Sequence, residues 1–323
     1  MYQSLSNFFA ELPFFQSPLF GILALIIVGS SWCGVGLVMG HAPKKGVEPS
    51  LVQLLGGIVS LLAGTVIFFG TSCTTTATLK VILLTGLTSF TAAIVNFCML
   101  QLLSKAMQNG PNGVIWSMTQ SSLLIPFLTG IIFFNVAFTL TRCMGIIALL
   151  FALLFFGLAK NNKPKGEKNN IWKYQAMGCF FLAGTTQTLS SLPSYFPEAR
   201  EVPSILRAMA GASGSFLMAI SYNLARMTPE HKAKIFASFR KPILWIYVGV
   251  LQFFGLIFAY TLLYPGMDVL GKNNMGAISY PLLVGSCIAS FAIAGKFLLK
   301  EDFTFWQILA LSFCFGGLFL ICL

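Results

Sequence analysis

Charged residues are scarce in this chain of 323 residues. Only 9% of its residues are Asp, Glu, Lys or Arg, whereas soluble domains carry roughly 25%. A chain with so little charge cannot cover a surface that faces water. The composition therefore excludes an ordinary soluble domain and predicts a protein that faces lipid over most of its area. The mean hydropathy of +0.82 agrees with this prediction.

Acidic residues are the scarcest charged type, with nine against 20 basic residues. All nine lie outside the central portions of the apolar stretches, and neither His41 nor His231 lies there. Proton-coupled transporters generally carry the proton on an acid or a histidine inside the membrane. We therefore expect neither proton coupling through a membrane acid nor export of organic cations. Coupling would need an acid at the interface, such as Glu198, Glu201 or Asp268.

Patterns that hold metals or form disulfide frameworks are also missing. The eight cysteines form no CxxC pair, and most lie inside apolar stretches, which is typical of small buried hydrophobic residues. We find no clustered His, acid and Cys constellation, so we expect no enzyme, no metal and no cofactor. Met1–Ser17 has no Lys or Arg, so no cleavable signal peptide is evident, and we expect this segment at the membrane interface.

Long apolar stretches dominate what remains. A helix needs about 20 apolar residues to cross the hydrocarbon core of a bilayer. We therefore predict an all-α integral membrane protein with ten transmembrane helices. The predicted helices are Pro18–Gly40, Ser50–Gly70, Leu79–Leu103, Gly113–Phe134, Phe138–Ala159, Trp172–Pro193, Pro203–Arg226, Pro242–Tyr264, Met275–Leu299 and Phe303–Leu323.

Basic residues are distributed unevenly over the links between these stretches. Fifteen of the 20 lie in alternate links, several of them in the hydrophilic central segment Lys160–Asn170. Loops rich in Lys and Arg stay in the cytoplasm. This predicts a multi-pass protein of the inner cell membrane with both termini outside the cytoplasm. The net charge of +11 then has a topological cause, so we expect no nucleic-acid partner.

The two halves of the chain repeat each other at low similarity. Glu48–Gly57 aligns with Val202–Gly211, and Val28–Ser31 aligns with Ala183–Thr186. The offset grows along the chain, which we attribute to a longer loop, Thr228–Lys241, in the second half. Each half holds five stretches, an odd number, so the second half enters the membrane from the opposite face. We therefore predict two inverted five-helix repeats, residues 1–162 and 163–323, as in alternating-access transporters.

Each half also closes with a helix, a short link and a last helix. In the second half this unit is Gly295–Gln307 followed by Ile308–Leu323, with Glu301 as the acid and Gln307 as the glutamine before the last helix. This arrangement of five plus five helices resembles the drug/metabolite transporter superfamily, in its ten-helix, EamA-like form. The resemblance covers essentially the whole chain.

Within that superfamily, the layout looks most like the rhamnose–proton symporter branch. The supporting residues are Lys44 and Lys45, which lead into Gly56–Ser60, and the segment Leu251–Phe254. This resemblance implies inward transport of a sugar-like substrate. The lack of a membrane acid counts against the proton coupling of that branch, and facilitated exchange fits the residues better.

Polar side chains inside the apolar stretches mark the expected substrate site. They are costly in lipid and usually face a cavity or a neighbouring helix. Amides and hydroxyls can bond sugar hydroxyls or a nucleobase edge, and indole or phenol rings stack on an apolar face. For Ser30, Ser31, Thr185 and Thr186 we expect contacts between helices instead. The substrate-binding residues that we predict are Trp32, Asn96, Trp116, Gln120, Gln187, Gln252, Tyr260 and Tyr280.

Arg207, one turn into the seventh stretch, is a predicted gate residue that attracts anions, although it could instead extend to the interface. Gly110–Gly113 and Asn273–Gly276 open the fourth and ninth stretches at corresponding positions of the two halves. Pro126 and Pro281 are expected to kink these two helices. Interrupted helix starts in matching places point to a transporter's site.

These features predict a transporter of a small polar organic metabolite, neutral or anionic and preferably sugar-like, that works by alternating access. Two alternatives stay open. One is an exporter or exchanger of amino acids or nucleoside-like metabolites. The other is a flippase of lipid-linked carriers, which would need a lateral opening. The expected partners are the small-molecule substrate and the lipid bilayer, and both a monomer and a homodimer fit.

Overall fold

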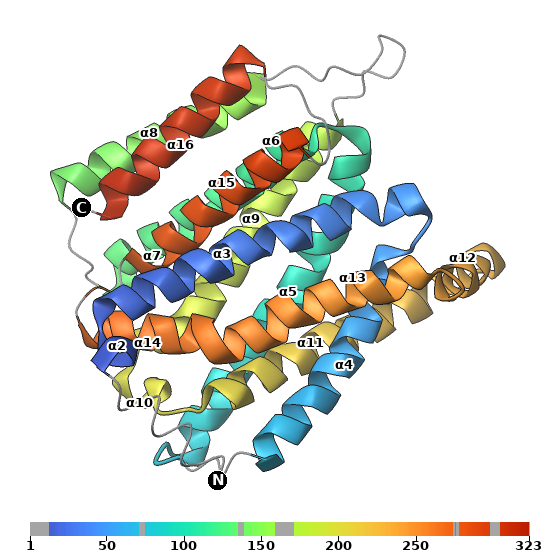
Figure 1. The fold of residues 1–323 in the computed structure, drawn as a ribbon, viewed down its shortest axis with the longest axis horizontal. Helices are drawn as coiled ribbons and strands as arrows, with labels where there is room; N and C mark the ends of the chain where they lie inside the picture. Colours follow the sequence, from blue (N-terminus) through green and yellow to red (C-terminus); the bar gives the residue numbers. More distant parts are fainter. Residues whose placement is uncertain are drawn as a thin grey trace.

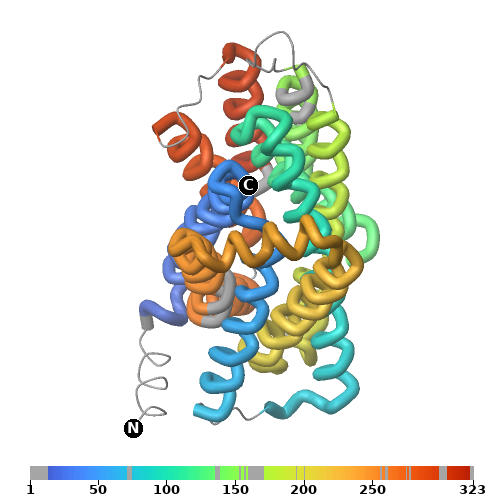
Figure 2. The backbone as a smooth tube through the Cα atoms, turned by 90° about the vertical axis from the view of Figure 1, so that its right-hand side faces the viewer, coloured from blue at the N-terminus to red at the C-terminus, as the bar shows by residue number. Residues whose placement is uncertain are grey.

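A computed structural model of the chain describes residues 13–70, 75–134, 139–158, 171–273, 275, 278–297 and 304–322. These residues form helices joined by short links, and no strand occurs among them. Most of the long helices run along one common direction (Figure 1). In the perpendicular view they form a bundle several helices thick (Figure 2). The predicted all-α fold is confirmed for this part of the chain.

Six helical segments are long and apolar enough to cross a membrane. The chain therefore has the helices of a membrane protein, as its composition predicts. These segments are α3 (Pro18–His41), α4 (Pro49–Gly70), α5 (Leu79–Asn109), the pair α6 (Asn112–Gln120) and α7 (Leu124–Phe134), α11 (Ser204–Ala225) and α15 (Ser279–Phe297).

Further helices occupy the remaining apolar stretches. The eighth stretch contains two π-helical turns, η5 and η6, between α13 and α14, and this kind of irregularity is frequent at functional sites. The segments are α8 (Leu140–Leu158), α9 (Ile171–Ser191), α13 (Pro242–Gln252), η5 (Phe253–Ile257), η6 (Ala259–Leu263), α14 (Tyr264–Lys272) and α16 (Phe305–Cys322). Shorter segments are α2 (Pro13–Gln16), η1 (Pro43–Lys45), η4 (Leu192–Tyr195) and α10 (Pro197–Arg200).

The two prolines predicted to kink their helices behave differently. Between α6 and α7 the chain forms a tight turn, η2 (Ser121–Leu123). Pro126 donates no N–H, and its ring opposes the carbonyl of Ser122, so the α-helical pattern is interrupted there. Pro281 instead lies in the first turn of α15, where its missing N–H breaks no helical bond. The interruption expected at Pro281 is therefore absent, and α15 is continuous.

The segment Thr228–Lys241 is mostly a helix, which corrects its interpretation as a loop. Its helix α12 runs over Pro229–Phe239. The Thr228 side chain accepts a hydrogen bond from His231 N at 3.2 Å and so caps the first turn. The negative charge of Glu230 in that turn interacts favourably with the positive end of the helix dipole.

Helices that are distant in sequence pack in pairs. Helix α3 packs against α15, and α5 packs against α9, which also packs against α6 and α7, so each of these pairs joins the two halves of the chain. The helix α4 packs against both α11 and α13, and α11 also packs against α5. The pair α8 and α16 lies side by side at one edge of the molecule (Figure 1).

Two glycines illustrate how closely these helices approach one another. A Cβ at Gly29 of α3 would lie 2.1 Å from the Leu283 carbonyl oxygen of α15. A Cβ at Gly184 of α9 would lie 2.3 Å from Ile125 Cδ1 of α7. Small residues of this kind let helix backbones approach closely in membrane proteins.

Candidate functional site

A cavity of about 370 Å³, the central cavity, lies between helices of both halves of the chain. Its size falls within the roughly 300–1,000 Å³ of pockets that bind small molecules. The first half contributes α3, α4, α5 and α6, and the second contributes α9, α11, η6, α14 and α15. A solute held in it would therefore contact both halves at once.

Most of the predicted site residues meet in this cavity although they are far apart in sequence. They come from α3, α5, α6, α9, α11 and α15. Amide, indole, phenol and guanidinium groups thus line one space. The predicted residues in the lining are Trp32, Asn96, Trp116, Gln120, Gln187, Arg207 and Tyr280.

Two predicted residues are not found in the lining. Gln252 Oε1 accepts a hydrogen bond from Ser60 Oγ, and Gln252 Nε2 would lie 2.6 Å from a Cβ at Gly56. Gln252 therefore joins α13 to α4, and only its partner Ser60 lines the cavity. Tyr260 belongs to the π-helical turn η6, but its side chain lies outside the described part of the structure.

Several polar groups at the cavity lack hydrogen-bond partners among the described residues. Gln187 Oε1, Thr186 Oγ1 and Trp116 Nε1 are buried and unpaired, with only the weak acceptor Cys287 Sγ beside the indole. Gln120 is 6% exposed, and no hydrogen bond of its amide occurs within the described ranges. Unpaired buried groups are costly, so they favour a ligand that supplies donors and acceptors.

Arg207 is buried in the lining of the cavity, with only 6% of its surface exposed. Its Nη2 donates a hydrogen bond of 2.5 Å to the Ala199 carbonyl oxygen of α10. The guanidinium carbon lies 5.7 Å from the ring centre of Tyr264, within range of a cation–π contact. Its Nε has no partner in the described part of the chain. The guanidinium is thus held inside the protein rather than extended to the interface.

One cation lies in the described lining of the cavity, and the carboxyl group of Asp268 lies near enough to act on Tyr264 of that lining. Among the described lining residues, Arg207 is the only charged one, and none is Asp or Glu. The described ranges also contain no group of three or more His, Cys, Asp or Glu side chains that could hold a metal ion.

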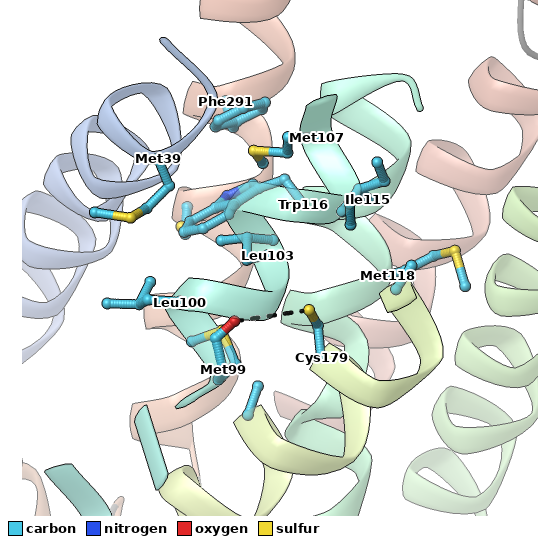
Figure 3. Packing of buried hydrophobic residues seen from close by; sticks show 14 of the residues in the cluster. Met39, Met99, Leu100, Leu103, Met107, Ile115, Trp116, Met118, Cys179 and Phe291 are labelled. Carbon is cyan, nitrogen blue, oxygen red and sulfur yellow. Dashed lines mark hydrogen bonds between the residues drawn. The ribbon is translucent and has the colours of Figure 1, made fainter. Parts of the chain in front are cut away.

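One end of the cavity is closed by a packed layer of hydrophobic side chains. The Trp116 ring stacks on Phe291, with ring centres 5.2 Å apart and planes at 24°. Figure 3 shows this pair beside Met39, Leu103 and Met107, which are all fully buried. Trp116 itself also lines the cavity, so its indole forms the boundary between cavity and layer.

Some lining residues were absent from the prediction. Thr186 was assigned to contacts between helices, yet it lines the cavity, as do Ser60 and Thr119. Tyr264 was placed at the end of its stretch, whereas the helical segment continues through α14 to Lys272. The only sequence signal for Tyr264 was an aromatic hydroxyl next to Pro265 in an apolar stretch, which does not distinguish a cavity from the interface.

Comparisons with known proteins bear on the fold alone. No family model matches the chain, and no curated protein matches it. The chain is similar to a solved structure described only as "Crystal structure of protein", with 14% identity, 94% of each chain covered and a TM-score of 0.56. The fold is therefore shared with a known structure over nearly the full length of both chains.

Proposed function

We propose that the protein is a transporter that moves a small polar organic metabolite across the membrane by alternating access. The observation that carries this proposal is the central cavity, which is enclosed by helices of both halves and lined by unpaired amides and aromatic rings. Pockets of this size with a few convergent polar groups are typical of small-molecule sites.

The packing of the helices supports two inverted repeats of five. If the first five helical units correspond in order to the last five, the pair α3–α15 corresponds to α9 with α6 and α7. The pair α5–α9 then corresponds to η6 and α14 against α3, and α5–α11 to α13–α4. The pairs α4–α11 and α8–α16 correspond to themselves. All of these pairs pack together, as expected for two halves related by a twofold axis.

The closely packed glycines agree with the same correspondence. Gly29 and Gly184 are aligned positions of the repeated segments. Gly29 approaches α15, in the ninth stretch, and Gly184 approaches α7, in the fourth stretch. Because the ninth stretch corresponds to the fourth, the two contacts are equivalent. This match supports ten membrane-crossing units and membership of the drug/metabolite transporter superfamily as parts of the proposal.

The lining favours a neutral or anionic solute. The amides of Gln120 and Gln187 can each donate and accept, as sugar hydroxyls require. The rings of Trp32 and Tyr280 offer faces for the apolar side of a sugar or a planar group. Arg207 in the lining would attract a negative charge of the solute. In this proposal the Trp116–Phe291 layer closes one side of the membrane while the other side admits the solute.

The test combines a ligand screen with transport assays. The purified protein is screened by thermal shift against sugars, amino acids, nucleosides and phosphorylated metabolites, and uptake of the hit is measured in proteoliposomes. We expect Gln120→Ala and Gln187→Ala each to lower uptake about tenfold, because each removes a hydrogen bond to the solute.

Gln175→Ala is the matched control, since Gln175 lies on α9 with Gln187 but outside the central cavity. Its uptake should equal that of the unmodified protein. Normal uptake by both cavity variants would move the site elsewhere. Metabolite counterflow in vesicles without lipid-linked carriers separates this transporter from a flippase.

A further inference from the structure

A second cavity, which we call the basic cavity, lies near the start of α4 and the ends of α5 and α11, away from the parts of these helices that line the central cavity. It measures about 360 Å³ and is enclosed by the start of α4, the last turns of α5, the end of α11 and α12. None of its lining residues lines the central cavity. The buried Phe97 lies on α5 between Asn96 and the basic cavity, and it packs edge-on against Tyr222 at 5.5 Å.

Three cations and one acid line the basic cavity. Lys105 comes from α5, Arg226 follows α11, and Lys234 comes from α12. Glu48 is the acid, and its Oε1 accepts a hydrogen bond of 3.3 Å from Ser50 Oγ. The lining therefore carries two uncompensated positive charges. This balance matches a phosphate group, which carries about −1.5 to −2 charges at neutral pH, better than a carboxylate.

Arg226 is an exposed residue whose side chain contacts Tyr222, one helical turn before it. Its Nη1 donates to the Tyr222 hydroxyl, and its guanidinium carbon lies 5.1 Å from the centre of the Tyr222 ring. An arginine fixed in this way loses little further freedom when it binds an oxyanion. Both residues line the basic cavity, so the remaining guanidinium donors are available to a ligand there.

A buried amide provides the second, independent observation. Gln101 lines the basic cavity and is only 7% exposed. Its Nε2 has no hydrogen-bond partner among the described residues. A buried N–H donor without an acceptor is costly and rare in folded proteins. An oxyanion in the cavity would supply the missing acceptor.

We propose that the basic cavity binds a phosphate group, either of a soluble phosphate or of a lipid headgroup. Arg226, Lys105 and Lys234 neutralise the ligand, and Gln101 Nε2 donates to one of its oxygens. The face that holds this cavity also carries Lys44, Lys45 and Lys241. The site is separate from the central cavity, so its ligand need not be the transported solute.

The experiment measures binding without transport. The melting temperature of the full chain in detergent is titrated with sodium phosphate and, at matched ionic strength, with sodium chloride. In a second arm the chain is reconstituted in phosphatidylcholine vesicles with and without phosphatidic acid. We expect stabilisation specific to phosphate in at least one arm, and about tenfold weaker binding for Lys105→Gln/Arg226→Gln.

Two further variants make the result specific. Lys232→Gln removes an exposed lysine of α12 that does not line the cavity, and it should bind as tightly as the unmodified chain. Gln101→Met removes the unpaired amide, so it should keep the melting temperature without phosphate while weakening the response to phosphate.

The two arms distinguish the source of the ligand. A response to inorganic phosphate assigns a soluble ligand, and a response only to phosphatidic acid assigns a lipid headgroup. Equal melting temperatures in phosphate and chloride, together with no effect of phosphatidic acid, would overturn the proposal. So would an equal loss of binding in Lys232→Gln, which would indicate a general effect of surface charge. Either negative result leaves the proposed transport through the central cavity untouched.

Discussion

Several polar side chains of the central cavity have few hydrogen-bond partners within the surrounding protein. Gln187 Oε1 and Thr186 Oγ1 are buried without partners among the described residues, and each such group costs about 1–3 kcal/mol. Trp116 Nε1 has only the weak acceptor Cys287 Sγ beside it. Structural polar residues in the same bundle behave otherwise: Ser104 Oγ donates to the Met39 carbonyl oxygen at 2.9 Å. Some of the buried unpaired groups of the described chain therefore belong to residues that line the central cavity, and others, such as the Gln53 amide, lie outside it.

The identity of the cavity residues was predictable only in part. Gln187 and Gln252 both carry amides within apolar stretches, so nothing in the sequence distinguishes a cavity residue from a helix contact here. The structure separates them because Gln252 reaches Ser60 on α4, whereas Gln187 faces the cavity. Which side of a helix faces a cavity depends on how the helix is rotated in the bundle, and one sequence does not fix that rotation.

Gly29 lies at a close contact between α3 and the backbone of α15. Gly29→Ala should lower the free energy of unfolding by about 1–3 kcal/mol, because the added methyl overlaps the α15 backbone at Leu283. Gly249→Ala is the control, since no atom lies within 4 Å of the added Cβ and alanine favours the helix. Thermal unfolding in detergent checks both. A Gly29→Ala protein as stable as the unmodified one would contradict this close packing of α3 on α15.

At the scale of elements, long apolar helices were predictable and irregular segments were not. The first, second and seventh predicted transmembrane helices coincide with α3, α4 and α11 to within a few residues, because a membrane helix needs an uninterrupted apolar run. The helix α5 extends to Asn109, beyond the predicted end at Leu103, because Ser104, Ala106 and Met107 are buried within the bundle. Hydropathy does not record such burial.

The helix α12 was missed because its composition is polar. Its start nevertheless carries local signals: Thr228 at the cap, Pro229 in the first turn and Glu230 beside it. We predict that Thr228→Ala speeds amide hydrogen exchange of residues 230–239, since losing the cap costs about 0.5–2 kcal/mol. Thr228→Ser should retain slow exchange. Equal exchange in the Ala variant would mean that packing, rather than the cap, holds α12.

At the scale of the whole molecule, the helices of both halves of the chain line one cavity. We propose that these two halves repeat the same arrangement of helices. Short aligned segments of the sequence indicate the repeat that we propose, and Gly29 and Gly184 in those segments both lie at close helix contacts. The substrate was not predictable, because the described lining combines residues from nine helical segments whose relative positions appear only in the fold. The ten-helix count, the inverted orientation and the transport activity stay predictions.

The inverted repeat is tested most directly by finding on which side of the membrane the links after α5 and α14 lie. These links correspond to each other in the proposed repeat. Single cysteines replace Asn109 and Lys272 in a chain whose native cysteines are removed. Both residues are exposed and lie at the ends of α5 and α14, which are equivalent positions in the proposed repeat. Intact cells are treated with a membrane-impermeant maleimide. The account predicts that Lys272→Cys is labelled and that Asn109→Cys is labelled only after permeabilisation. Labelling of both cysteines from the same side would contradict it.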